Sequence, residues 1–167
     1  FVGIDWGICS PSICICPEPF NIEECQFHFF RSTKAQAKIN VKGLNHYEKM
    51  EFTSDMQRYE KLAEWAIEKI PRGSKIAMEG YSFSSSGLIF NLAENTAILK
   101  YKLYKLGYDV HIIPPTSVKK FYTGKGNATK QLMEKVFKNE NGDLLDCLGK
   151  STSPRSDIID SFAICKM

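Results

Sequence analysis

The sequence has no long hydrophobic run, few histidines and little net charge. Its longest apolar stretches are short, as at 87–90, whereas a membrane-spanning helix needs about 18 or more consecutive apolar residues. We therefore expect no membrane association. The net charge of the 167 residues is only +3, so total charge neither requires nor excludes a nucleic-acid partner.

Catalytic motifs based on histidine or paired cysteine are also missing. There are three histidines, and no G-x-S-x-G motif accompanies them, which excludes the usual serine hydrolase arrangement. The six cysteines form no pair of C-x-x-C motifs, which argues against a zinc site. Cys14 and Cys16 have strand spacing within an apolar run and are expected to be small buried hydrophobes. We interpret all six as reduced thiols.

Hydrophobic residues make up 43% and charged residues 25% of the chain, which is typical of a soluble globular protein. The length fits one domain, residues 1–167. Hydrophobic periodicity predicts five strands, at 1–8, 12–16, 24–31, 75–79 and 108–113. Helices are expected at 53–70, 88–107, 116–122, 128–139 and 154–167.

This order predicts an α/β fold with a five-stranded mixed sheet and helices on both faces. The three leading strands are expected to be antiparallel, and the later strands parallel. The segment at about 32–52 is polar, rich in lysine and weakly periodic. We interpret it as an insertion or loop.

Four acidic residues have apolar neighbours. Asp5 lies within the first strand and Glu79 ends another, and an unpaired charge at such a position is costly. Asp157 and Asp160 are three residues apart on a predicted helix, so they share one face and repel each other unless a cation lies between them. Four carboxylates without His or Cys favour two Mg²⁺ ions, with Mn²⁺ as a substitute, rather than zinc.

Each acid also has a simpler explanation when it is taken alone. Asp5 could cap a turn, Glu79 could pair with a lysine, and Asp157 could cap a helix after Ser156. The joint pattern of two strand acids and two helix acids is what favours a metal site.

A cationic segment at 119–138 carries six lysines and only one acid, Glu134. Such a strip inside a nearly neutral protein suits a phosphate-binding surface, although a solvated helix face would look the same. A helix that begins near Thr116 and a loop at 124–126 offer backbone amides to phosphate.

Four segments resemble the RuvC group of Holliday junction resolvases, within the RNase H-like (retroviral integrase) superfamily. Residues 3–7 are similar to its G-I-D-x-G strand, and 77–79 to the strand that ends in glutamate. Residues 115–130 resemble its P-x-x-V-K and T-G-x-G-x-A-x-K signature, which is the most specific match. Residues 157–163 are similar to its D-x-x-D-A-x-A helix.

The resemblance implies an RNase H-like fold and a homodimer that cuts four-way or other branched DNA. It implies metal ligation and catalysis by Asp5, Glu79, Asp157 and Asp160, with Lys119 and Lys130 near the cleaved strand and Lys130 also catalytic. Together with the charge pattern, it gives a set of DNA-binding lysines: Lys119, Lys120, Lys125 and Lys130. The implied reaction is two-metal hydrolysis that leaves 5′-phosphate and 3′-hydroxyl ends.

Two segments depart from the family pattern. The family places an aromatic residue three positions after the glutamate, and here Ser82 stands there between Tyr81 and Phe83. Either aromatic could stack at the junction, or one could pack beneath the loop. The segment at 32–51 is unlike the compact bacterial enzymes, which motivates the hypothesis of a phage or viral member. We expect a cytoplasmic protein, in the host cell if it is viral.

Other function classes fit the sequence less well. An RNase H-fold nuclease acting on RNA–DNA hybrid or RNA is the main alternative, because the acids alone do not distinguish it. An actin-like or sugar-kinase ATPase would need two large lobes. A catalytically inactive binding module would not need all four acids.

Overall fold

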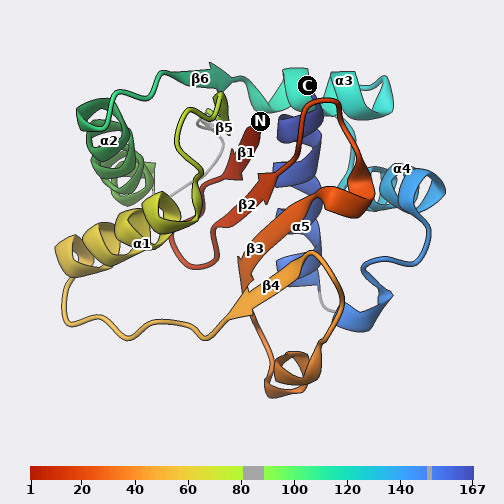
Figure 1. Cartoon of the computed structure of the whole chain (residues 1–167), viewed down its shortest axis with the longest axis horizontal. Helices are drawn as coiled ribbons and strands as arrows, with labels where there is room; N and C mark the ends of the chain where they lie inside the picture. Colours follow the sequence, from red (N-terminus) through yellow and green to blue (C-terminus); the bar gives the residue numbers. More distant parts are fainter. Residues whose placement is uncertain (81–88, 150–151) are drawn as a thin grey trace.

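The structure is a computed structural model, and it describes residues 1–80, 89–149 and 152–167 (Figure 1). The strands are β1 (Val2–Asp5), β2 (Ser12–Ile15), β3 (Gln26–Phe30), β4 (Leu44–Tyr47), β5 (Ile76–Glu79) and β6 (Val110–Ile113). The α-helices are α1 (Asp55–Lys69), α2 (Ile89–Lys105), α3 (Pro115–Thr123), α4 (Lys130–Asn141) and α5 (Thr152–Lys166). Short 3-10 turns lie at Ile22–Glu24, Lys34–Lys38 and Asp146–Leu148.

The strands form one mixed sheet in the order β4-β3-β2-β1-β5-β6. β1, β2 and β3 are antiparallel neighbours, and β5 and β6 continue the sheet in parallel with β1. The expected α/β fold, with antiparallel leading strands and later parallel ones, is confirmed. Parallel neighbours need a crossover, and α1 and α2 follow this rule because they precede β5 and β6.

The sheet has six strands rather than the five predicted. The additional strand, β4, lies within the 32–52 segment that we expected to be a loop, and it runs parallel to β3 at the edge of the sheet. Only Leu44 of its four residues is buried. An edge strand with one buried side chain gives no alternating pattern, and this is why the sequence did not reveal it.

Helices cover both faces of the sheet, as expected. On one face α1 and α2 pack over Val2, Ile4 and Met78, while α3, α4 and α5 pack over the opposite face around Phe27 and Phe162 (Figure 1). α1 forms where the sequence predicts it because Ser54 caps its first turn and its apolar residues recur at helical spacing. No helix in the described part of the chain is long and apolar enough to cross a bilayer.

The expectation that all six cysteines are free is wrong for one pair, because Cys16 and Cys25 form a disulfide. The last aligned pair between β2 and β3 is Ile15 with Gln26, so Cys16 and Cys25 are opposite each other one position further along. Their Cα atoms are 4.4 Å apart. This pairing follows from the strand register, which residue spacing alone did not reveal.

Candidate active site

Two of the predicted acids end neighbouring strands. Asp5 is the last residue of β1 and Glu79 is the last residue of β5. The strands are parallel, and Ile4 is aligned with Met78 one residue earlier. Both carboxylates therefore lie at the same edge of the sheet, which is where α/β folds commonly place their binding sites.

A close approach of α5 to β1 brings the other two acids to this edge. A Cβ atom at Gly3 would collide with the backbone of Ser161 and Cys165, so only glycine lets the helix lie this near the strand. The Oγ atoms of Ser12 and Ser161 are 3.0 Å apart in a hydrogen bond that also holds β2 against the helix. The glycine of the G-I-D segment thus has a packing role that sets the position of Asp157 and Asp160.

Three serine hydroxyls fix the orientation of Asp157. Ser153 and Ser10 donate to its Oδ2 at 2.7 and 3.3 Å, and Ser156 donates to its Oδ1 at 3.0 Å. Ser156 also accepts a hydrogen bond of 3.2 Å from Lys130 Nζ. The sequence did not identify the roles of Ser10 and Ser153, because their proximity to Asp157 depends on the tertiary fold.

The acids act on one another electrostatically. Burial raises the pKa of Asp5 well above its ordinary value, and the negative charges of Asp160, Asp157 and Glu79 raise it further. Burial and the charge of Asp160 raise the pKa of Glu79 from 4.5 to about 7. Burial, with a contribution from Asp157, raises the pKa of Asp160 from 3.8 to about 6. The four predicted acids therefore form one site with an excess of negative charge.

Two of the predicted lysines belong to the same site. Lys119 on α3 and Lys130 at the start of α4 both lower the pKa of Glu79 and of Asp160, which opposes the effect of burial. Lys130 also lowers the pKa of Asp5. Cationic side chains beside clustered carboxylates can contact a phosphate that approaches the acids.

The other two predicted lysines lie on the surface beside this pair. Lys120 is on α3, and Lys125 is in the turn between α3 and α4; both are exposed. This turn is ordered by Gly124, whose φ of 79° ends α3 in the left-handed region, and by Thr123, whose hydroxyl accepts from the Lys125 amide. The T-G-x-G segment thus builds a fixed turn rather than a loose loop. Tyr81 and Phe83 lie outside the described residues.

The donor set fits hard divalent cations. It offers carboxylate oxygens only, and a bound cation would offset the mutual repulsion that, beside burial, raises the pKa values of these acids. Within the described residues, no three of these acids have ligand oxygens all within 4.8 Å of one another, so they do not form a closed cage around a single ion.

A buried amide fixes the chain just after Asp5. Asn95, on α2, is fully buried, and its Nδ2 donates to the carbonyl of Gly7 at 3.5 Å. The contact joins α2 to the turn that follows β1, and it was not predicted from the sequence. A polar residue on the buried face of an otherwise apolar helix was the one available signal.

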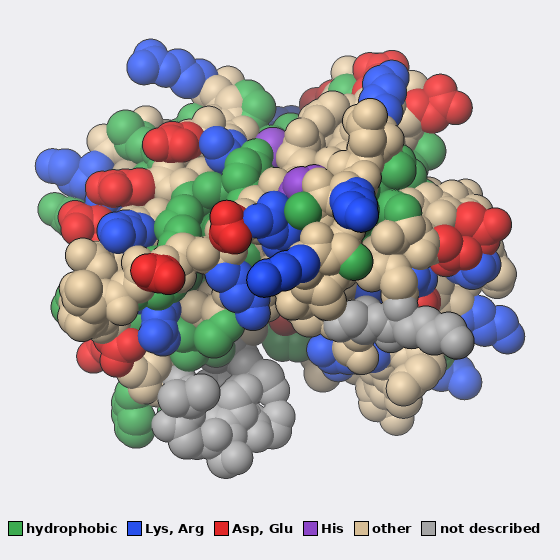
Figure 2. Space-filling view, turned by 90° about the horizontal axis from the view of Figure 1, so that it is seen from below, with side chains coloured by type: hydrophobic (Ala, Val, Ile, Leu, Met, Phe, Trp, Pro, Cys, Tyr) green, Lys and Arg blue, Asp and Glu red, His purple; other side chains and the backbone are tan. Residues whose placement is uncertain are grey.

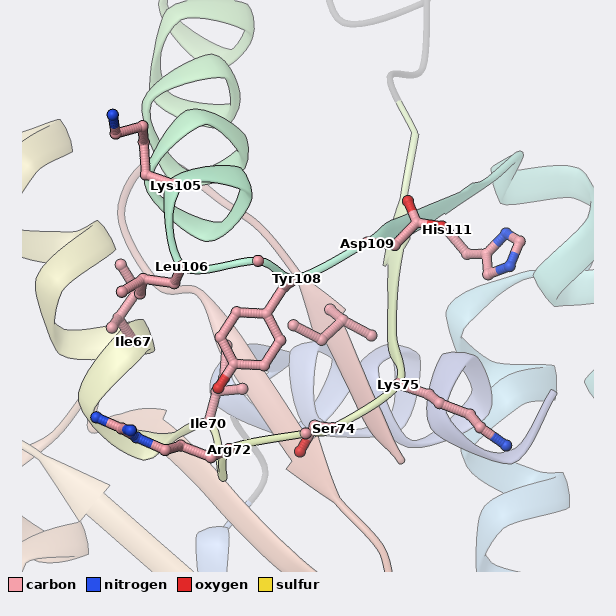
Figure 3. Close-up of a pocket in the computed structure, with 13 residues that line it drawn as sticks. Ile67, Ile70, Arg72, Ser74, Lys75, Lys105, Leu106, Tyr108, Asp109 and His111 are labelled. Carbon is pink, nitrogen blue, oxygen red and sulfur yellow. The ribbon is translucent and has the colours of Figure 1, made fainter.

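Two cavities among the described residues do not coincide with the acids. One of about 870 Å³ lies at the opposite end of β5, and its lining includes Arg72, Lys75, Lys105 and His111 with a single acid, Asp109 (Figure 3). A second, of about 640 Å³, includes two residues from the active-site side, Lys130 and Ser156. The first has no carboxylate cluster, so we do not assign catalysis to it.

Charges on the surface are mixed. Figure 2 shows one face on which Lys and Arg side chains are interspersed with Asp and Glu, in keeping with the small net charge of +3. Any phosphate-binding surface here is therefore local, as at Lys119 and Lys130. It is not a feature of this whole face.

Similar structures have the same fold. Thermus thermophilus RuvC matches with a TM-score of 0.60 and 17% identity over 99% of this chain and 91% of that one. A fowlpox virus resolvase, in complex with its substrate Holliday junction DNA, matches with a TM-score of 0.55 and 19% identity over 99% and 94%. The yeast mitochondrial Holliday junction resolvase Ydc2 matches with a TM-score of 0.58 and 15% identity over 98% and 75%.

These likenesses establish the fold. The chain has the RNase H-like architecture shared by bacterial, viral and mitochondrial resolvases, and the resemblance to RuvC drawn from the sequence motifs is confirmed at this level. No family model and no curated protein matches the sequence. Because the sequence identities to these structures are below 20%, the fold alone does not assign an activity, and any assignment must rest on the motif residues.

Proposed function

We propose that the chain is a structure-selective, metal-dependent DNA endonuclease that cleaves Holliday junctions and other branched DNA. The observation that carries this proposal is the meeting of Asp5, Glu79, Asp157 and Asp160 beside Lys119 and Lys130, in a fold shared with junction resolvases. A fold alone does not specify an activity, so the proposal depends on this site.

In this proposal the four carboxylates hold two Mg²⁺ ions, and Mn²⁺ substitutes for them. Ions held there would supply an activated water and charge stabilisation for the departing 3′ oxygen, and hydrolysis would then leave 5′-phosphate and 3′-hydroxyl ends. Asp5 is the best candidate for a ligand shared by both ions, because all three of the other acids, in addition to burial, raise the pKa of its carboxyl group. The serines around Asp157 keep one of its oxygens in a fixed direction.

The basic side chains in this proposal bind and position DNA. Lys130 is held by Ser156 on the acid side of the site and contacts the phosphate that is cut. Lys119 approaches the same phosphate from α3, while the exposed Lys120 and Lys125 contact the backbone further away. Tyr81 and Phe83 remain candidates for stacking at the branch point.

A test is cleavage of a labelled four-way junction in Mg²⁺, with products mapped on all four strands. Flap, plain duplex and RNA–DNA hybrid substrates complete the panel. We expect paired cuts in the junction, and we expect Asp5→Asn to reduce the rate by roughly 10³-fold or more while junction binding persists, since metal-assisted catalysis contributes several kcal/mol.

Asp109→Asn is the matched control, because this acid lies at the opposite end of the sheet. It should cleave at the normal rate. A normal rate for Asp5→Asn would refute the proposed site. Cleavage of the hybrid but not of the junction would instead identify an RNase H-type substrate.

We also propose that the enzyme acts as a homodimer. A two-fold symmetric junction is matched most simply by two copies of one chain, and α2 carries a stripe of apolar side chains, exposed among the described residues, that could join them. Phe90, Ala97, Tyr101 and Tyr104 recur at helical spacing on its exposed side, with 80% of Phe90, 62% of Tyr101 and 73% of Tyr104 accessible.

Sedimentation of the free protein tests this dimer. We expect the wild type to sediment as a dimer and Tyr101→Glu with Tyr104→Glu to sediment as a monomer that no longer makes paired cuts. Lys42→Glu is the control, because Lys42 is exposed just before β4, at the edge of the sheet away from α2, and its substitution changes the net charge by the same amount as the two tyrosine substitutions. A wild type that is monomeric both alone and on the junction would contradict the proposal.

A further inference from the structure

A cluster of sulfur atoms lies beneath the β2–β3 hairpin. The Sγ atoms of Cys14, Cys16 and Cys25 all lie within 4.8 Å of one another, and those of Cys14 and Cys16 are 3.4 Å apart. All three residues are buried, with at most 3% of their surface exposed. Among the described residues, this is the one group of three potential metal ligands that meets the spacing of a single ion.

The fold gathers these sulfurs from separate parts of the chain. Strand alternation places Cys14 and Cys16 on the same face of β2, and the register with β3 places Cys25 opposite Cys16. α5 covers this face, and its Cys165 is buried in the same hydrophobic cluster, where the thiol donates to the carbonyl of Phe1 at 3.5 Å. Two strands thus bring three sulfurs together beneath a helix that carries a fourth cysteine.

We propose that the reduced cluster is a structural site for a soft divalent ion such as Zn²⁺, ligated by Cys14, Cys16 and Cys25, with Cys165, which lies outside this group of three, as the fourth ligand. Zn–S bonds of about 2.3 Å in tetrahedral geometry require sulfur atoms roughly 3.8 Å apart. The Cys14–Cys16 separation of 3.4 Å is close to that value and no pair in the trio exceeds 4.8 Å, while the bonded Cys16–Cys25 pair moves apart once it is reduced. An all-thiolate set selects soft ions over Mg²⁺.

The disulfide and the metal exclude each other, so the site depends on redox state. A dithiol reductant transfers two electrons and two protons to the Cys16–Cys25 bond, giving two thiols and the oxidised reductant. Each thiol that then binds Zn²⁺ releases its proton to solvent. Oxidation by a small disulfide reverses the change, because it re-forms the Cys16–Cys25 bond, yields two small thiols and expels the ion.

The two states connect different elements. The disulfide joins only β2 to the start of β3, whereas an ion held by Cys14, Cys25 and Cys165 would also tie α5 to the hairpin. This site goes beyond the proposed nuclease, because it lies at the opposite end of α5 from Asp157 and uses none of its ligands. Its role is to stabilise the packing of the helix on the sheet.

Co²⁺ is a suitable probe, because thiolate ligation gives a charge-transfer band in the near ultraviolet that carboxylate ligation does not. We expect the reduced wild-type protein to develop this band to saturation with one equivalent of Co²⁺, and Zn²⁺ to displace it. Cys14→Ser should bind Co²⁺ less tightly and give a weaker band, although it leaves the Cys16–Cys25 pair intact. Cys147→Ser, which removes an exposed free thiol, should keep it.

A second measurement uses only the wild-type chain, in case the variants fail to fold. One equivalent of Zn²⁺ should raise the unfolding temperature of the reduced protein and leave that of the oxidised protein unchanged. Absence of the thiolate band in the folded reduced protein, or an equal band in Cys14→Ser, would overturn the proposal. Neither result depends on DNA cleavage, so failure here leaves the nuclease proposal standing.

Discussion

The two ends of α5 carry opposite kinds of chemistry. Near its beginning, Asp157 and Asp160 face the ends of β1 and β5 and complete a group of oxygen donors. At its end, Cys165 packs in the same buried cluster as Cys14, which belongs to the group of three sulfurs. The two groups share the buried face between them, where Gly3 allows the helix to lie directly on β1. Hard and soft donors are therefore kept apart by the length of one helix.

The groups also differ in how their charges are balanced. Burial is the main cause of the raised pKa values of Glu79 and Asp160, and the repulsion between the acids adds to it, while Lys119 and Lys130 oppose it. The sulfurs avoid this repulsion because a thiol is neutral and because two of them are joined covalently. Charged side chains suit a site that must bind and release a charged substrate, whereas neutral or covalently joined sulfurs suit a structural link.

Gly3→Ala should have the largest effect on stability, because both ends of α5 depend on the same close contact between this helix and β1. The added methyl group would overlap the backbone of Ser161 and Cys165, which cannot yield like a flexible side chain. We expect a loss of roughly 1–3 kcal/mol in the free energy of unfolding or more, measured by urea denaturation, together with reduced cleavage.

Gly7→Ala is the control for this change, because its new Cβ would meet its nearest neighbours only at ordinary contact distance, 3.8 Å from Ser10. Equal stability of the two variants would show that α5 does not rest on β1 as described.

The pH dependence of stability should reveal the acidic end of α5, because the pKa of Glu79 there is raised into the neutral range. The folded-state pKa of Glu79 is raised from 4.5 to about 7. Its contribution is thus fully present below pH 4.5 and is lost as pH rises through 7. In EDTA we expect the wild type to lose on the order of 1–3 kcal/mol relative to Glu79→Gln between pH 5 and 8.

The quantity to measure is the difference in the free energy of unfolding between the wild type and Glu79→Gln. His28 has a pKa lowered to about 4, mainly by burial, so its effect has the opposite sign and favours folding as pH rises toward 6.5. This effect is common to both proteins and cancels in the difference. Mg²⁺ should restore wild-type stability at pH 8, since a cation can replace the lost proton. A flat difference across this range would refute the raised pKa of Glu79.

Sequence reasoning located the acids because each carries a local signal. Asp5 and Glu79 interrupt apolar strands, and Asp157 and Asp160 have helical spacing. It did not locate the sulfur cluster, because the proximity of Cys25 to Cys14 follows from strand register and that of Cys165 from helix docking. Of the expectations about the cysteines, the burial of Cys14 and Cys16 is confirmed, and the reduced state of all six is wrong for the Cys16–Cys25 pair.

The helices and strands also divide into those that sequence patterns predicted and those that they did not. Elements with strong periodicity, such as α1 and the strand of Phe27 and Phe29, were predicted close to their observed positions. β4 was missed because its pairing with β3 arises from backbone hydrogen bonds at a mostly polar edge. The serines around Asp157 were missed for a related reason. Ser10 is 147 residues away from Asp157 in the sequence, and no sequence pattern indicates that a serine hydroxyl has so distant a partner.

Lys130→Ala should give the smallest of these effects and should act at the acidic end alone. Loss of one phosphate contact is expected to slow junction cleavage about tenfold and to make the salt dependence of binding shallower by about one unit of slope. Lys130 also lowers the pKa of Asp160 and Glu79, so the acid limb of the pH–rate profile should move to higher pH.

Lys135→Ala is the matched control, because Lys135 is an exposed lysine on the same helix, α4. It changes the net charge equally but has no contact with the acids among those described. A pure charge effect would slow both variants alike and leave both pH profiles unchanged. A shift of the profile in Lys130→Ala alone would place this lysine within the electrostatic balance of the carboxylates, a role that general attraction of DNA does not supply.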